Sequence, residues 1–129
     1  MYKMQQTIKV VCGLLLNNNI VYLPKRAKTL KYYPDFYEFP GGKVEANENN
    51  LDTLKRELYE ELSIIVKDCD IIPFPGNNII NNNIDLTCYL VTHWTNNIKI
   101  NPNINSELIK LDIKELHNVN ELLETDKLL

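Results

Sequence analysis

The chain has few of the residues that carry covalent cross-links or soft-metal chemistry. It contains three cysteines, two histidines and one tryptophan among 129 residues. An odd cysteine count without a framework pattern argues against a disulfide-stabilised secreted domain and for a reducing, intracellular setting. The cysteines and histidines also show no zinc spacing. We therefore expect a cytoplasmic protein without a soft-metal site.

Long hydrophobic runs and an excess of positive charge are also absent. The apolar stretch Ile8 to Leu16 is interrupted by Lys9, is too short to span a bilayer and starts too near the terminus for a signal peptide. It predicts a buried strand and no membrane partner. The net charge of −3 and the lack of a basic stripe argue against a long nucleic-acid partner. Length and a hydrophobic content of 44% predict one domain over residues 1–129.

Glycine is scarce, with four in the chain, yet two of them are adjacent in Phe39-Pro40-Gly41-Gly42. Adjacent glycines can take positive φ, so this segment predicts a sharp turn whose backbone approaches a ligand closely. An ordinary turn is the alternative. Lys43, which follows at once, is a candidate phosphate contact.

An amphipathic helix is predicted directly after this loop, from Leu51 to Leu62, with Asn50 as its N-cap. Leucines at helical spacing form one apolar stripe. At about 100° per residue, Glu57, Glu60 and Glu61 lie together on one face beside that stripe. The acids are thus expected at the seam where the helix packs.

Crowded carboxylates destabilise a helix, and a solvated acidic face is the simplest interpretation of such a group. The glycine loop favours another one, a site for Mg²⁺ or Mn²⁺ built from Glu57, Glu60 and Glu61, joined by a loop carbonyl near Gly41. A metal would also reconcile the negative chain with a polyanionic nucleoside triphosphate. Arg56 is assigned an orienting role with Glu48, and a purely structural ion pair between them is equally compatible with the sequence.

The remaining segments predict a mixed sheet covered on both faces. Asparagine clusters, including Asn77 to Asn78 and Asn81 to Asn83, are placed in turns. The expected order is strand Thr7 to Leu15, turn Asn17 to Asn19, strands Ile20 to Leu23, Ile64 to Lys67, Asp85 to Trp94 and Glu107 to Asp112, and a closing helix from about Asn120 to Leu128.

The segment from Gly42 to Ile64 resembles the Nudix box, G-x5-E-x7-R-E-U-x-E-E-x-G-U, where U is a bulky apolar residue. Every position matches except one, where Ser63 replaces the last glycine. Ser63 must either adopt the left-handed conformation that glycine takes easily, at a cost of roughly 1 kcal/mol, or end the helix differently.

Outside the box the chain is most similar to the MutT branch of nucleotide-pool-cleaning diphosphatases. Tyr37 to Lys43 resembles its W-E-F-P-G-G-K, and residues 86–94 resemble its long strand. The resemblance implies a Nudix fold, an α/β/α sandwich around a mixed sheet, and Mg²⁺-dependent hydrolysis of a nucleoside triphosphate to monophosphate and pyrophosphate. Segment Ile71 to Asn83 has no counterpart in that branch, and we consider that it covers the nucleotide.

The same resemblance assigns roles to single residues. Glu57, Glu60 and Glu61 carry over as metal ligands, with Glu61 also deprotonating the attacking water. Glu107 becomes a metal ligand or base positioner, although taken alone it would be a surface residue. By the same resemblance, the nucleobase is recognised by Arg26, by the backbone of Phe39 and by Asn120. An N-cap is the alternative role of Asn120.

The leading functional hypothesis is a diphosphatase for 8-oxo-dGTP or related nucleotides, acting in nucleotide-pool sanitation and DNA repair, as a monomer or homodimer. A second hypothesis keeps the box chemistry on another substrate, such as CTP or another nucleoside triphosphate, a dinucleoside polyphosphate, a nucleotide sugar or an RNA cap. A third is a catalytically inactive Nudix-fold binding module. The complete set of box carboxylates argues against the third.

Overall fold

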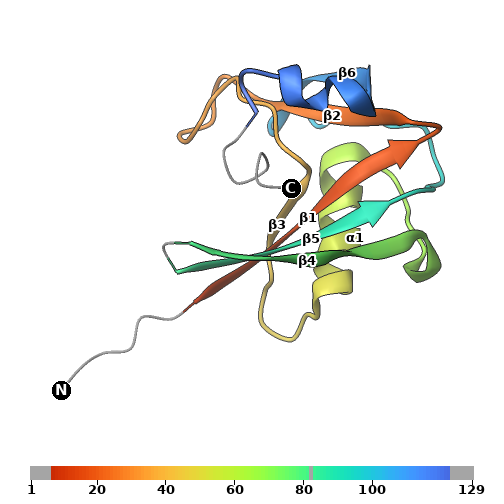
Figure 1. The fold of residues 1–129 in the computed structure, drawn as a ribbon. Coiled ribbons are helices and arrows are strands. Elements are labelled where there is room, and N and C mark those ends of the chain that lie inside the picture. Colours follow the sequence, from red (N-terminus) through yellow and green to blue (C-terminus); the bar gives the residue numbers. More distant parts are fainter. Residues whose placement is uncertain (1–6, 82, 123–129) are drawn as a thin grey trace.

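Strands β4, β5, β1, β2 and β6 lie side by side in this order in one mixed sheet, and β3 pairs with β1 (Figure 1). The computed structural model describes residues 7–81 and 83–122. In chain order the elements are β1 (Ile8–Asn17), β2 (Ile20–Arg26), β3 (Gly41–Lys43), α1 (Asn50–Leu62), the short 3-10 helix η1 (Asp68–Asp70), β4 (Ile71–Asn81), β5 (Ile84–Val91), β6 (Asn105–Asp112) and the 3-10 helix η2 (Ile113–Asn118). The predicted mixed sheet is confirmed.

Strand β1 is the centre of the fold. It pairs in parallel with β5 over its length, antiparallel with β3 near its start, and antiparallel with β2 near its end. Val11 and Leu15 are almost completely buried, which confirms the buried strand expected from the apolar run. The turn into β2 is the predicted one, with Asn18 and Asn19 at φ 52° and 64°, a conformation that asparagine tolerates and tight hairpins require.

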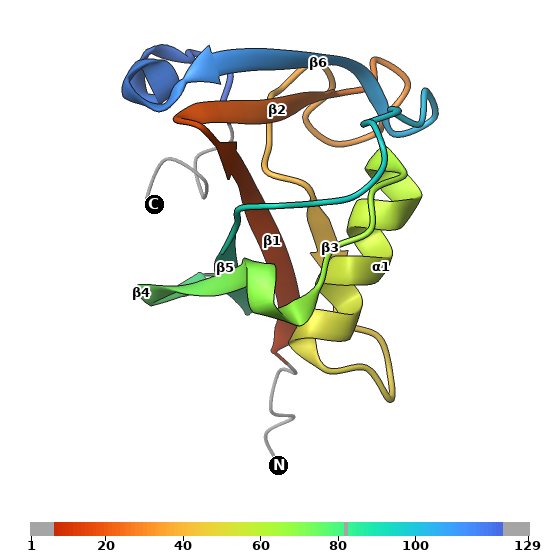
Figure 2. The ribbon, with the colours of Figure 1, turned by 90° about the vertical axis from the view of Figure 1, so that its right-hand side faces the viewer.

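Two hydrophobic clusters cover the two faces of the sheet. On one face α1 packs through Leu54, Leu58 and Leu62 against β1 (Figure 2). On the other face Phe39 packs with residues of β1 and β2 and with Leu122. No helix in the described part of the chain is long and apolar enough to cross a membrane. The predicted closing helix falls mainly on residues 123–129, which are outside the described residues.

The N-terminus of α1 lies one residue earlier than predicted. Asn49 is the N-cap, and its side-chain oxygen accepts from the amide of Asp52 at 2.8 Å. Asn49 and Asn50 are equally good caps by type, so only the backbone path decides between them. At the other end Ser63 takes the left-handed conformation (φ 61°, ψ 24°) and donates its amide to the carbonyl of Tyr59.

The sequence misplaced the strand that follows α1. The strand expected at Ile64 to Lys67 is wrong, because only an isolated bridge joins Ile65 to Thr95 there. Segment 71–81 is instead a strand, β4, so the expected turn at Asn77 to Asn78 is also wrong. Two prolines and a glycine hide this strand in the sequence, and β4 tolerates them because it lies at the sheet edge and contains a register shift.

The predicted strand ends were displaced by up to three residues. Strand β2 continues beyond Leu23 to Arg26, and β5 ends at Val91 instead of Trp94. Strand β3 was not expected, because a three-residue segment with two glycines has no strand periodicity. This short strand brings the glycine loop against the centre of the sheet.

Candidate active site

The three acids of α1 differ strongly in exposure. Glu61 is buried, with 4% of its surface exposed, because it lies on the side of α1 that faces the sheet. The Glu57 side chain is 17% exposed and that of Glu60 is 50% exposed. The acids therefore extend from the protein interior to the solvent along one edge of the helix, as the spacing predicted.

Gly41 and Gly42 are needed for space and not for backbone conformation. A Cβ at Gly41 would overlap the backbone of Val11 in β1, and a Cβ at Gly42 would overlap the carboxylate of Glu57. Neither glycine takes the left-handed φ, and both lie in strand β3, so the sharp turn predicted at them is wrong. What the glycines allow is close contact between β3 and α1, where the amide of Gly41 donates to Glu61 Oε2 at 3.0 Å.

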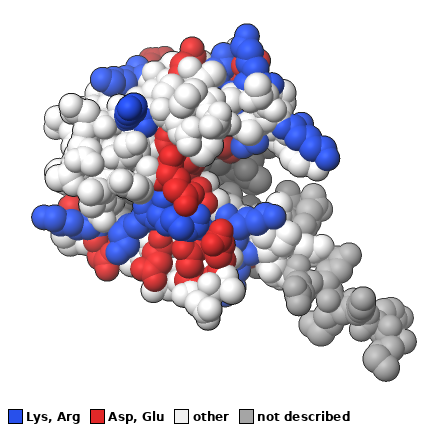
Figure 3. Space-filling view, turned by 180° about the vertical axis from the view of Figure 1, so that it is seen from behind, with Lys and Arg blue, Asp and Glu red and all other residues white. Residues whose placement is uncertain are grey.

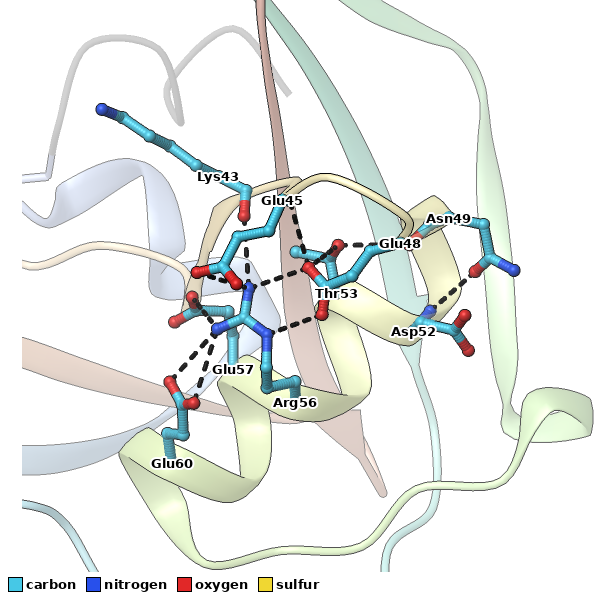
Figure 4. A network of polar contacts seen from close by, with 9 residues as sticks. All are labelled: Lys43, Glu45, Glu48, Asn49, Asp52, Thr53, Arg56, Glu57 and Glu60. Carbon is cyan, nitrogen blue, oxygen red and sulfur yellow. Dashed lines mark hydrogen bonds and ion pairs between the residues drawn. The ribbon is translucent and has the colours of Figure 1, made fainter.

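Arg56 is the centre of an ion-pair network on the exposed side of α1 (Figure 4). Its Nε donates to Glu48 Oε2 at 2.7 Å and its Nη2 to Glu48 Oε1 at 3.0 Å, a bidentate contact. Its Nη1 donates to Glu57 Oε1 at 3.0 Å and to Glu60 Oε2 at 3.3 Å. The predicted pairing of Arg56 with Glu48 is confirmed, and Figure 3 shows such a grouping of acidic side chains around basic ones on one face.

The network also affects the ionisation of Glu48. The Arg56 contact lowers the pKa of Glu48 to about 2, so Glu48 is ionised at every physiological pH. The fully buried Thr53 hydroxyl donates to the same carboxylate at 2.9 Å. Glu48 and Thr53 thus hold the guanidinium at one end, and its other end is directed at Glu57 and Glu60.

Burial has the opposite effect on the inner acids. It raises the pKa of Glu61 well above the ordinary range, and the nearby carboxylates of Glu57 and Glu38 raise it further. Burial also raises the pKa of Glu57, against the lowering effect of Arg56. Because the charge of Glu57 acts on Glu61, a cation beside these two carboxyl groups would relieve their repulsion.

The donor set fits a hard divalent cation. It offers carboxylate oxygens at graded depth and a closely apposed loop backbone, which are the ligand types that Mg²⁺ and Mn²⁺ take. Within the described residues, no three acidic, histidine or cysteine side chains are already arranged to hold a metal. Glu57 and Glu60 are turned toward Arg56 instead, so coordination by all three acids requires both side chains to exchange that partner for the ion.

Arg26 lies at the end of β2 and is held by two contacts. Its Nη1 donates to Glu38 Oε1 at 2.7 Å, and its Nε donates to the carbonyl of Tyr32 at 3.0 Å. Glu38 is a further candidate site residue, which the sequence did not single out. Burial raises its pKa, which Arg26 opposes, and its charge acts on Glu61. Its position next to Phe39-Pro40-Gly41 was the available signal.

The predicted base-reading residues come together from three segments, 26, 36–39 and 119–122. The amide of Arg26 donates to the carbonyl of Phe36 at 2.8 Å, and the amide of Tyr37 donates to the carbonyl of Glu121 at 2.9 Å. The Phe39 side chain is buried, which leaves its backbone as the group able to contact a base. Asn120 is exposed beside these segments, and the helix that it would cap lies outside the described residues.

Two predicted residues lie apart from the acids of α1. Glu107 is on β6, where its Oε1 accepts from the hydroxyl of Tyr37 at 2.8 Å; burial, followed by this contact, raises the pKa of Tyr37 to about 12. Within the described residues, Glu107 contacts Tyr37 and Lys25, and its predicted role toward the metal stays a prediction. Lys43 is exposed, with its carbonyl accepting from Arg56 Nη2 and its side chain extending away from the network (Figure 4).

The chain belongs to the NUDIX family: the NUDIX domain model matches residues 6–128, nearly the whole chain. This match agrees with the mixed sheet and with the position of α1 against its centre. The fold is a Nudix α/β fold, as the box predicted.

Its relatives are named for one activity. The chain is 33% identical over 96 residues to an 8-oxo-dGTP diphosphatase of Proteus vulgaris, which covers 73% of this chain and 84% of that one. It is 38% identical over 92 residues to an 8-oxo-dGTP diphosphatase of Buchnera aphidicola, covering 69% of this chain and 66% of that one, just under two thirds. The crystal structure of a MutT NUDIX hydrolase from Burkholderia pseudomallei superposes with a TM-score of 0.80 over 96% of this chain and 95% of that one; at 19% identity it shows the fold alone.

Proposed function

We propose that this protein is a Mg²⁺-dependent nucleoside triphosphate diphosphatase that converts 8-oxo-dGTP, or a closely related nucleotide, to the monophosphate and pyrophosphate. The observation that supports the chemistry most directly is the buried Glu61, held by the Gly41 amide next to Glu57. The names of the relatives support the substrate. Mn²⁺ is the expected substitute for Mg²⁺.

In this mechanism Glu57, Glu60 and Glu61 would hold the metal, and its charge would supply polarisation of the phosphoryl group and a lowered pKa of the attacking water. The Gly41 amide orients Glu61, whose carboxylate accepts the proton of that water. Arg56 keeps Glu57 and Glu60 in place and balances their charge until coordination. Lys43 contacts the phosphates, and its exposed side chain is free to turn toward them.

The nucleobase is held by the three segments around Arg26, Phe39 and Asn120. An amide side chain can both donate to and accept from a purine edge, and a site that hydrogen-bonds one edge discriminates against bases lacking it. Because Arg26 is engaged by Glu38 and Tyr32, we assign it to the wall of the site and leave edge recognition to Asn120 and the Phe39 backbone. We place the reaction in the reducing cytoplasm, consistent with the exposed thiol of Cys69.

A hydrolysis panel in which all products are separated by ion-exchange chromatography tests the proposal. A nucleoside triphosphate gives a monophosphate and pyrophosphate, whereas a dinucleoside polyphosphate gives two nucleotides and no pyrophosphate. The panel compares 8-oxo-dGTP, dGTP, CTP, dUTP and a dinucleoside polyphosphate, each with Mg²⁺, with Mn²⁺ and with EDTA. We expect the highest kcat/KM with 8-oxo-dGTP and no turnover in EDTA. A preference for the dinucleoside polyphosphate would show that the substrate belongs to another class than the one proposed. Inertness toward every compound would overturn the enzymatic proposal.

A further inference from the structure

A pocket of about 340 Å³ lies between β2, β6 and the loop that follows β5. Its lining includes Tyr22 from β2, Lys110 from β6 and Trp94 from the loop. Val21 and Leu23 pack on the same face of the sheet as Phe39. Because side chains alternate between the faces of a strand, Tyr22 lies on the other face. The pocket is therefore on the opposite face of β2 from the base-reading segments. Its volume lies at the lower end of the range for small-ligand sites, about 300–1,000 Å³.

The lining combines flat aromatic surface, amides and one cation. The rings of Tyr22 and Trp94 meet edge to face, with centroids 5.1 Å apart at an interplanar angle of 84°. Lys110 Nζ lies 5.4 Å from the centroid of the Tyr22 ring, and Asn96 and Asn97 contribute amide groups. The lining contains no carboxylate. Such a surface suits a planar heteroaromatic ring with polar edges that carries an anionic group.

The loop that forms one wall of this pocket also holds the C-terminal end of α1. The amides of Lys99 and Asn101 donate to the carbonyls of Leu62 and Glu61 at 2.9 and 3.0 Å. Asn96, in the pocket lining, donates its side-chain amide to the carbonyl of Ser63 at 3.2 Å. Figure 2 shows the loop running from β5 below β2 to the end of α1. A ligand that moves this loop would therefore move the backbone of Glu61.

We propose that this pocket is a second binding site, for a nucleoside monophosphate, and that its occupancy alters the rate at the acids of α1. The rings of Tyr22 and Trp94 contact the base, the two asparagines contact its polar edge, and Lys110 neutralises the phosphate. A single lysine balances the charge of one phosphate group better than that of a triphosphate. The regulatory part rests on the proposed function, which makes a nucleoside monophosphate the reaction product; the binding part does not.

Intrinsic fluorescence tests the binding directly, because Trp94 is the one tryptophan of the chain and lies in the pocket. The full chain is titrated in EDTA with GMP, AMP, CMP and UMP, and with guanosine and inorganic phosphate as the two halves of the ligand. Free N-acetyltryptophanamide corrects for absorption by the nucleotide. We expect a saturable change with at least one monophosphate and a weaker one with either half. No saturable change with any of them would overturn the proposal.

Variants localise the signal. Lys110→Met is expected to weaken the apparent affinity about tenfold, the effect of losing one charge-assisted contact. Lys114→Met, which removes an exposed lysine of η2 outside the pocket, is the matched control and is expected to bind as the wild type does. Equal affinity in the wild type and in Lys110→Met would overturn the site. A loss of affinity seen only in Lys43→Met would overturn it too, because it would place the monophosphate near the acids of α1. Asn97→Ala, at an exposed loop position, provides a second pocket variant with little effect on folding.

Turnover then separates regulation from binding. In the presence of Mg²⁺ the monophosphate that binds is expected to change kcat in the wild type, and Lys110→Met is expected to keep the basal kcat and lose that response. A purely competitive effect, raising KM alone and unchanged in Lys110→Met, would contradict the coupling. If the protein hydrolyses none of the tested substrates, the proposed function fails. The fluorescence titration still decides whether the pocket binds a monophosphate.

Discussion

The acids of α1 and the base-reading segments are assembled in opposite ways. The acids, their arginine and the glycine loop all lie between residues 41 and 61, joined by a network of short contacts. The base-reading segments come from residues 26, 36–39 and 119–122 and meet mainly through backbone hydrogen bonds. The proposed function therefore assigns the chemistry to one contiguous part of the chain and the selectivity to segments about a hundred residues apart.

Under the proposed function this difference separates the rate of the chemistry from the choice of base. Changes in residues 119–122 or in the loop before Tyr37 would alter which base fits without touching the acids. Changes between residues 41 and 61 would alter the rate on every substrate. The variants below test that division, beginning with the largest effect.

Glu61→Gln is expected to lower kcat by about 10²–10⁴-fold, because the amide can neither accept the water's proton nor ligate as an anion. The fold should persist, since a glutamine oxygen can still accept from the Gly41 amide. The measurements are steady-state kinetics with 8-oxo-dGTP and the melting temperature by circular dichroism. Asp52→Asn, at an exposed position on the same helix, is the control. A kcat within threefold of wild type would remove Glu61 from the mechanism.

Gly42→Ala is expected to lower activity about 10–100-fold and to raise the Mg²⁺ concentration needed, because the new methyl group displaces the Glu57 carboxylate. A double-mutant cycle with Glu57→Gln identifies the cause. If the methyl group acts only through Glu57, the double variant is no slower than Glu57→Gln alone. Additive losses would show that Gly42 has a separate role.

Asn120→Ala is expected to reduce the preference for 8-oxo-dGTP over dGTP about tenfold, the value of one lost hydrogen bond, with kcat almost unchanged. The ratio of kcat/KM values for the two substrates measures this effect. Asn118→Ala, an exposed neighbour bonded to Glu115, is the control. An unchanged ratio would remove Asn120 from base recognition and break the proposed division.

The metal-free protein should become more stable as the pH falls through the raised pKa of Glu61 toward its ordinary value of 4.5. Burial raises the pKa of Glu61 in the folded state, so the folded chain binds the proton more tightly than the unfolded chain and loses stability as the pH rises through that pKa. Urea unfolding in EDTA at several pH values measures this slope. Glu61→Gln should flatten it, and an equal slope in the variant would assign it to other groups.

Glu48 should have the opposite effect at lower pH. Its pKa falls from 4.5 in the unfolded chain to about 2 in the folded one, so the stability from its Arg56 contact is present above pH 4.5 and lost as the pH falls toward 2. The same unfolding series, extended to acid and repeated with Glu48→Gln, separates this loss from the gain due to Glu61.

The smallest effect is expected from Ser63→Gly, which should stabilise the fold by about 1 kcal/mol because a left-handed residue without Cβ relieves backbone strain. Urea unfolding measures the change. Ser106→Gly is the control: this exposed serine lies in β6, where glycine should destabilise. Activity should stay unchanged in Ser63→Gly, since the substitution affects the end of α1 and not the acids.

Local patterns predicted some elements well and others badly. The leucine stripe gave α1 within one residue of its start, and the Asn17 to Asn19 cluster gave the first hairpin. Strand β4 was missed because its prolines and glycine break the alternation, and its pairing with β5 compensates for them. The role of the two glycines was misjudged because the crowding comes from β1 and α1, which are distant in the sequence.

The sequence by itself determined the acids of α1 and their helical face, because helical periodicity acts over a few residues. Only the tertiary structure decided that Glu61 is buried with a raised pKa, that Glu38 acts on it, and that residues 119–122 pack beside residues 36–39. Burial and electrostatic coupling depend on which distant segments pack together. Those contacts arise from the pairing of β1 with its neighbours, which no local pattern specifies.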